Sequence, residues 1–318
     1  MSARAPMVSV LLPVHDGGEF LRPTVESVLA QTMADFEIVL VDDGSKDGRV
    51  DEIAALQEPR IAILRREWRG VVEALNAALA AARGRFLALL DHDDLWLPWR
   101  LERHVRAFDE RPATDLTFNW CRFVDERGDD LGLPIRRWHG PISRDELLID
   151  FVMKTPSTMV VRREAAERSG GFDPTLPRLS DLEFALRVAG LRPGNCHAVP
   201  EVLTLYRRHP GQMSRQWIEL QREWDRLLAR MVAQPGGPSA AVRSLADSNM
   251  HRYFAWLASE QGELRDAVAL LAAGVRRAPR RALADPRNWL LAGDIAARRT
   301  LAPRAHQRLR RVARLLWQ

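Results

Sequence analysis

The sequence predicts an α/β protein in which helices flank a mixed sheet, followed by an all-helical C-terminal extension. Two observations support this fold class. Between residues 8 and 90, short apolar runs alternate with amphipathic helices, as expected for parallel strands with right-handed crossovers. Beyond Gln216 the residues are nearly all helix-forming. We therefore expect a sheet domain over residues 1–215 and a helical extension over residues 216–318.

The first part of the chain supplies the parallel strands. They are predicted at residues 8–12, 36–41, 61–64 and 86–90. The intervening helices are predicted near residues 23–29, 50–57 and 70–83. Pro23 suits a first helical turn, and Gly84 suits a helix end.

The pattern is less regular further along. Helices are predicted at residues 99–110, 144–152 and 179–189, and strands at 116–124, 157–161 and 202–206. A Pro- and Gly-rich break at residues 234–238 precedes a helical hairpin over residues 253–279. The hairpin is similar to one tetratricopeptide unit, without a second copy. A final helix is predicted at residues 303–317.

Composition is that of an ordinary globular protein, with 46% hydrophobic and 28% charged residues in 318. No apolar run is long enough to span a membrane, and residues 1–7 lack the apolar segment of a secretory signal. The two cysteines, Cys121 and Cys196, form no disulfide framework or zinc motif. These features predict a cytoplasmic protein.

Three acidic or glycine-containing turns each follow an apolar run, at residues 13–18, 42–45 and 91–94. In an open parallel sheet such turns lie at the same rim, where ligands bind. A rim rich in carboxylates suits a divalent cation and a phosphorylated ligand.

Asp91 and Asp93 are one residue apart, so in extended geometry both side chains point the same way and can hold Mg²⁺ or Mn²⁺. Asp42 and Asp43 can accept hydrogen bonds from a nucleotide base or ribose. Each pair has a structural alternative, a solvated turn for the first and a helix-capping Asp-Gly turn for the second. The sequence lacks the glycine motifs of dinucleotide-binding and P-loop proteins and the Gly-x-Ser-x-Gly elbow.

Six motifs, in order, resemble those of family 2 glycosyltransferases, which have the Rossmann-like GT-A fold. They are VSVLLPVHD at 8–16, VLVDDGS at 39–45, FLALLDHDD at 86–94, GGFD at 170–173, SDLEFALR at 180–187 and YRRH at 206–209. The resemblance covers residues 8–214. It implies a nucleotide-binding half over residues 1–98 and an acceptor-side half over residues 99–215.

The resemblance also implies roles for individual residues. The residues implied for the nucleotide pocket are Pro13, Val14, Asp16, Asp42, Asp43 and Arg69. Asp42 or Asp43 would contact the base, and Arg69 would lie near it, although the family commonly has Asn before the following glycine.

The remaining implied residues concern the diphosphate and the chemistry. Asp91 and His92 would contact the diphosphate, and the metal ligands would be Asp91, Asp93 and His209, with Asp93 the more direct one. Asp181 would be the general base, although Ser180 stands where an acidic residue is more common. Arg187 would pair structurally.

The function that follows is inverting transfer of a sugar from a nucleoside-diphosphate sugar, UDP-linked by preference, to a hydroxyl of a glycan or lipid-linked acceptor. Mg²⁺ or Mn²⁺ would be the cofactor. Two alternatives stay open: a nucleotidyltransferase-like enzyme, and a non-catalytic nucleotide-sugar-binding module whose helices form an interaction platform.

The net charge is +5, and nearly all basic residues are arginines. For the whole chain we attribute this to compositional bias and expect no nucleic-acid partner. The final helix carries Arg304, Arg308 and Arg311 beside apolar residues. It would either lie on the inner face of an anionic membrane or pack on the protein body.

Overall fold

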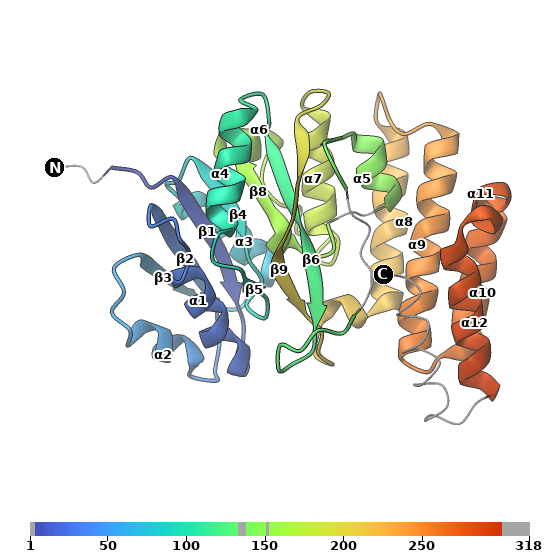
Figure 1. Cartoon of the computed structure of the whole chain (residues 1–318), viewed down its shortest axis with the longest axis horizontal. Coiled ribbons are helices and arrows are strands. Elements are labelled where there is room, and N and C mark those ends of the chain that lie inside the picture. The colour runs from blue at the N-terminus through green and yellow to red at the C-terminus, as the bar shows by residue number, and fades with distance from the viewer. Residues whose placement is uncertain (1–3, 133–137, 151–152, 301–318) are drawn as a thin grey trace. The chain divides into compact units, whose positions relative to one another are not determined.

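The computed structural model describes residues 4–132, 138–150 and 153–300 (Figure 1). The chain forms two compact units. Most described residues up to His209 form the first unit. The second begins at Pro210 and also includes Gly132, Leu148, Ile149 and Asp150. Each unit is described by itself below.

The described residues of the first unit form a nine-stranded mixed sheet in the order β3-β2-β1-β4-β8-β6-β9-β5, with β7 beside β9. The strands of the parallel half are β1 (Val8–Val14), β2 (Phe36–Asp43), β3 (Ile61–Arg66) and β4 (Phe86–Leu89). The others are β5 (Leu95–Trp96), β6 (Leu116–Val124), β7 (Pro141–Ile142), β8 (Met159–Arg162) and β9 (Cys196–Arg207). The predicted α/β class with a mixed sheet is confirmed.

Helices enclose the parallel half, in which β1, β2 and β4 are buried on both faces. Alternate β1 residues, Val8 to Val14, face one core cluster together with side chains of α1 (Leu21–Leu29), α2 (Arg49–Ala54) and α4 (Arg100–Glu110). α3 (Val71–Ala81) packs against β1 and β2, and Figure 1 shows it behind the sheet. This arrangement leaves the carboxyl ends of the parallel strands at one rim.

The second half of the sheet differs in detail from the sequence prediction. β9 begins at Cys196 rather than at residue 202, and it follows β6 through register shifts beside Trp120. β5 and β7 were not predicted, since two residues are too few to show a periodic pattern. The helices here are α5 (Arg144–Asp150), α6 (Arg163–Ser169) and α7 (Ser180–Gly190).

The described part of the second unit is helical. Its helices are α8 (Trp217–Ala233), α9 (Ala240–Glu260), α10 (Leu264–Arg277), α11 (Pro279–Ala284) and α12 (Pro286–Thr300). α9 and α10 form the predicted hairpin, but α9 begins well before residue 253 because Ser239 caps it by accepting a hydrogen bond from the Val242 N–H. The helix predicted at residues 303–317 lies outside the described residues.

A partly buried polar cluster joins α8, α9 and α10. The carboxylate of Asp247 accepts a hydrogen bond from Trp224 Nε1 at 3.0 Å and lies 3.1 Å from His251 Nδ1. The guanidinium of Arg277 forms an ion pair with the same carboxylate. Three helices are therefore connected through one acidic side chain.

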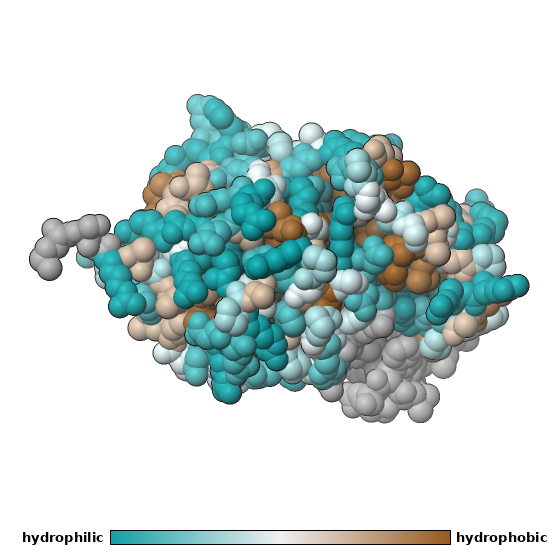
Figure 2. Space-filling view, turned by 90° about the horizontal axis from the view of Figure 1, so that it is seen from above, coloured by the Kyte–Doolittle hydropathy of each residue, from teal (hydrophilic) through white to brown (hydrophobic). Residues whose placement is uncertain are grey.

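The surface is largely polar on the face shown in Figure 2, where apolar residues form small patches. Among the described helices, none is both long enough and apolar enough to cross a membrane.

Candidate active site

The first two acidic turns are bonded to each other at the rim. His15 Nδ1 lies 2.8 Å from the carbonyl oxygen of Asp43. The Asp16 N–H donates to Ser45 Oγ at 3.1 Å, and the Lys46 N–H donates to Asp16 Oδ1 at 2.7 Å. Asp16 therefore holds the two turns together, while its side chain stays half exposed.

The third turn is attached to the first through α1. Thr24 Oγ1 lies 2.9 Å from the carbonyl oxygen of His92 and 2.8 Å from that of Asp94. A Cβ atom at Gly17 would lie 3.4 Å from the His92 ring. All three turns thus belong to one surface.

The two aspartates that end β2 have different surroundings, although both are buried. Among the described residues, Asp42 has a local partner: its Oδ1 accepts a hydrogen bond from the Ser45 N–H at 2.9 Å. Asp43 accepts the Gly70 N–H at 2.7 Å and lies 3.1 Å from Arg66 Nε. Asp43 therefore holds the loop that leads into α3 and forms a wall of the site.

Two exposed aromatic residues lie beside this loop. The Trp68 side chain is 66% exposed, and its ring centroid lies 6.2 Å from that of His15. Gly44 allows this approach, since it has φ +78° and a Cβ there would lie 2.9 Å from the Trp68 nitrogen. Of the residues here, only the exposed Arg69 was predicted from the sequence; neither aromatic was, because a lone loop aromatic carries no periodic signal.

Pro13 and Val14 are fully buried at the end of β1. The Val14 side chain belongs to the hydrophobic core cluster. At these two residues a ligand would therefore contact the main chain rather than the side chains.

The turn after β4 brings three carboxylates together. Asp91, Asp93 and Asp94 each offer an oxygen, and these oxygens lie within 4.8 Å of one another. Burial, then the charges of Asp93, Asp94 and Asp181, raise the pKa of Asp91 well above its usual value. Burial and the charge of Asp93 raise the pKa of Asp94 to about 7. Such repulsion is relieved by a proton or a cation, and the oxygen donor set fits Mg²⁺ or Mn²⁺.

Asp94 differs from the other two carboxylates because the protein uses both of its oxygens. Oδ1 accepts the Arg207 N–H at 3.0 Å, and Oδ2 accepts the Thr155 hydroxyl at 2.7 Å. Asp94 is fully buried, and the Asp91 N–H donates to Ser157 Oγ at 3.0 Å. Asp94 therefore connects the turn to β9 and to the segment before β8, and leaves Asp91 and Asp93 to face a ligand.

His209, just beyond β9, lies against the same turn. Its Nε2 is 2.8 Å from Asp93 Oδ2, and its ring centroid is 4.9 Å from that of Phe20. Burial raises the pKa of Asp93, but the hydrogen bond with His209 and the charges of His92 and His209 outweigh it, so the pKa is lowered. Arg207 Nε donates to the Asp93 carbonyl at 2.8 Å.

Asp181 is the second residue of α7 and is almost fully buried. The positive end of the helix dipole favours a carboxylate at this position. Its negative charge contributes to the raised pKa of Asp91, so the two carboxylates act on each other electrostatically.

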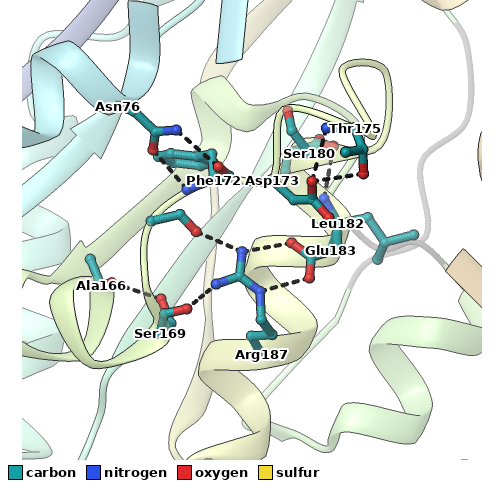
Figure 3. A network of polar contacts seen from close by, with 12 residues as sticks. Asn76, Ala166, Ser169, Phe172, Asp173, Thr175, Ser180, Leu182, Glu183 and Arg187 are labelled. Carbon is teal, nitrogen blue, oxygen red and sulfur yellow. Dashed lines mark hydrogen bonds and ion pairs between the residues drawn. The ribbon is translucent and has the colours of Figure 1, made fainter. Parts of the chain in front are cut away.

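Polar contacts around the segment before α7 set the position of this helix (Figure 3). The Asn76 amide of α3 bonds both the N–H and the carbonyl of Phe172, at 2.8 and 2.9 Å. Arg187 bonds both carboxylate oxygens of Glu183 at 2.6 Å and donates to the carbonyls of Ser169 and Gly171. Arg187 therefore has the structural pairing expected from the sequence.

Gly171 is required where α3 meets this segment. Its φ is +74°, and an added Cβ would lie 2.8 Å from Asn76 Oδ1. Any side chain would strain the backbone and displace the Asn76 amide.

Comparisons with known proteins identify the family and the fold. Residues 9–170, about half of the chain, match the model of "Glycosyl transferase family 2". The chain belongs to glycosyltransferase family 2. It carries a glycosyltransferase domain. An uncharacterized glycosyltransferase of Rickettsia felis is 28% identical over 220 residues, which is 66% of this chain and 36% of that protein. This chain thus spans about a third of that relative's length.

Solved structures of similar fold include complexes with nucleotide sugars. S. aureus TarS 1–349 in complex with UDP-GlcNAc has a TM-score of 0.63 and 14% identity, covering 86% of this chain and 82% of that chain. The mannosyltransferase PcManGT from Pyrobaculum calidifontis, in complex with GDP-Man and Mn²⁺, has a TM-score of 0.61 and 20% identity. It covers 99% of this chain and 86% of that chain. At these identities the likeness establishes the GT-A-like fold.

Proposed function

We propose that this protein transfers a sugar from a nucleoside-diphosphate sugar to an acceptor hydroxyl, with inversion at the anomeric carbon and with a divalent cation. One observation carries the proposal. The rim places the carboxylates of Asp91 and Asp93 beside His209 and within electrostatic range of the Asp181 carboxylate. This arrangement supports a cation site and a general base within one active site.

The nucleotide would bind over the first two turns. Asp42 is the better candidate for the base, because Asp43 is occupied by the loop before α3. His15, Trp68 and Arg69 would border the base, and Asp16 with the main chain of Pro13 and Val14 would complete the pocket. We propose a UDP-linked donor, as the family resemblance implies.

Asp91, Asp93 and His209 would hold Mg²⁺ or Mn²⁺, with His92 beside the diphosphate. When bound, the cation offsets the negative charge of the diphosphate leaving group. Asp94 and Thr155 keep the turn in place rather than supplying ligands.

Asp181 would accept the proton of the acceptor hydroxyl as that oxygen forms a bond to the anomeric carbon. The bond from that carbon to the diphosphate oxygen breaks on the opposite face, and the nucleoside diphosphate leaves with the bonding electrons. One displacement inverts the centre, and no covalent enzyme intermediate forms.

We further propose a glycan or lipid-linked acceptor, and action in the cytoplasm at the inner face of the membrane. The division into a catalytic part over residues 1–215 and an accessory part over residues 216–318 belongs to this proposal. Family membership favours a glycosyltransferase over a nucleotidyltransferase. The acidic turn together with Asp181 disfavours a role in binding alone.

The first prediction concerns the base. Asp181→Asn should slow Mn²⁺-dependent release of nucleoside diphosphate by about 10²–10⁴-fold, because the amide cannot accept the hydroxyl proton. Release is measured with UDP-sugars and a panel of glycan and lipid-linked acceptors, and the anomeric form of the product by NMR. The matched control is Asp145→Asn on the exposed side of α5. An Asp181→Asn protein as fast as the control, or a product that retains its configuration, would contradict the mechanism.

A further inference from the structure

The charge of the chain is divided unevenly. Residues 210–318 contain nineteen arginines and no lysine, against nine acidic residues. The preceding 209 residues contain more acidic than basic side chains. Although the net charge of the whole chain is only +5, its C-terminal part is strongly basic. Such an uneven distribution is typical of proteins that bind an anionic surface.

The described basic residues gather most densely where α10 gives way to α11. Residues 276–281 include four arginines. Arg277 is engaged by Asp247. Arg276, Arg280 and Arg281 are exposed, and no carboxylate within the described ranges pairs with them. Three positively charged side chains are thus exposed to solvent within six residues of the sequence.

Apolar side chains are exposed next to these arginines. Leu283 is 52% exposed and Trp289 is 61% exposed. The indole N–H of Trp289 donates to the Leu283 carbonyl at 2.8 Å, so the two residues are in contact. Arg280 lies one helical turn before Leu283 on α11, which places charge and apolar surface side by side.

We propose that this face docks on an anionic phospholipid bilayer. We use the name α11 face for six exposed residues that lie close in sequence on α11 and the adjoining ends of α10 and α12: Arg276, Arg280, Arg281, Leu283, Trp289 and Leu290. Its arginines would bind lipid phosphates, while Leu283 and Trp289 enter the headgroup region. Because the Trp289 N–H is already bonded within the protein, the ring can leave water without stranding a donor.

An anionic bilayer would provide a partner for both the arginines and the apolar side chains of this face. A nucleic acid would bind the arginines but would leave the aliphatic side chains of Leu283 and Leu290 without a partner. An acidic protein would satisfy the charges, and it is retained as an outcome of the test. The inference does not depend on the chemistry assigned to Asp181, although it would bring a lipid-linked acceptor close to the enzyme.

The test is cosedimentation of the full-length protein with vesicles of phosphatidylcholine alone or mixed with phosphatidylglycerol. We expect binding only to the mixed vesicles and weakening with salt. Replacing Arg276, Arg280 and Arg281 by Gln should lower the affinity roughly a hundredfold, at about 1 kcal/mol for each arginine. Replacing Leu283 and Trp289 by Ser should lower it about tenfold or more.

Matched controls separate this face from general charge. Arg222, Arg226 and Arg243, replaced by Gln, change the net charge equally on exposed positions of α8 and α9. Val232 and Val268, replaced by Ser, remove exposed apolar groups elsewhere. Both controls should bind like the parent protein. Thermal melts confirm that all variants fold.

Three results would overturn the proposal: no preference for the anionic vesicles, equal losses in test and control variants, or binding that depends only on Arg308, Arg310 and Arg311 of the predicted final helix. A protein partner would instead be indicated if a soluble acidic polypeptide inhibited vesicle binding and if the Leu283 and Trp289 variant bound the vesicles as well as the parent protein does. If the protein binds the anionic vesicles but transfers no sugar, the proposed function alone would be refuted.

Discussion

At the scale of single residues, the three aspartates of the acidic turn have different surroundings. Asp91 and Asp93 face the rim, whereas Asp94 is enclosed and takes hydrogen bonds from Arg207 and Thr155. The Thr155 hydroxyl also lies 3.4 Å from Asp91 Oδ2. Thr155 is therefore a positioning residue for two carboxylates of the turn.

Thr155→Val tests this role because valine keeps the shape and removes the hydroxyl. We expect a loss of about 1–3 kcal/mol in the free energy of unfolding, since a buried acceptor loses its donor. We also expect weaker Mn²⁺ binding, measured by calorimetry, because the turn is no longer held. Thr155→Ser restores the hydroxyl and should recover both properties. Mn²⁺ affinity that is equal in the two variants would show that Thr155 serves stability only.

At the scale of elements, one carboxylate joins three helices of the second unit. Burial raises the pKa of Asp247, but hydrogen bonds from His251 and Trp224, the charge of His251 and a hydrogen bond from Arg277 outweigh it and lower the pKa to about 2. Since the pKa in the unfolded chain is near 3.9, the folded state favours the ionised form. The resulting stabilisation is present above about pH 4 and is lost as the pH falls towards 2.

Asp247→Asn should therefore destabilise the protein by about 2 kcal/mol at neutral pH, and the difference from the parent should shrink as the pH falls through this window. Urea unfolding, followed by circular dichroism at a series of pH values, measures it. Asp266→Asn, on an exposed position of α10, is the control. A difference that stays constant with pH would mean that the Asp247 charge is not responsible.

At the scale of the whole molecule, the site depends on the parallel order of β1, β2 and β4. Parallel pairing places the ends of these strands at one rim, where α1 and the loop before α3 connect the turns. A nucleotide bound there would bridge several segments, so its binding should stabilise the folded chain as a unit.

Thermal shift measures this effect. UDP with Mn²⁺ should raise the melting temperature by several degrees, because a ligand at 100 times its Kd adds about 2.7 kcal/mol. UDP without the cation should raise it less. Asp93→Asn should remove the part of the shift that depends on Mn²⁺, whereas Asp129→Asn in an exposed turn should not. A shift that is equal with and without Mn²⁺ would contradict the proposed cation site.

Much of the fold was predictable because its signals are local. Apolar runs followed by acidic turns located β1, β2 and β4, and helical periodicity located α3 and the α9–α10 hairpin. β5 and β7 escaped prediction because each has two residues. The full length of β9 escaped because its irregular pairing with β6 obscures the alternation of apolar residues.

The sequence by itself determined which carboxylates reach the rim, since the apolar strands and the turns that directly follow them are encoded by neighbouring residues. Only the tertiary structure decided what each carboxylate does. Asp94 is held by Thr155, 61 residues away, and Asp43 holds a loop 27 residues away at Gly70. Hydrogen bonds between such distant segments depend on how the chain packs, and no pattern of nearby residues encodes them.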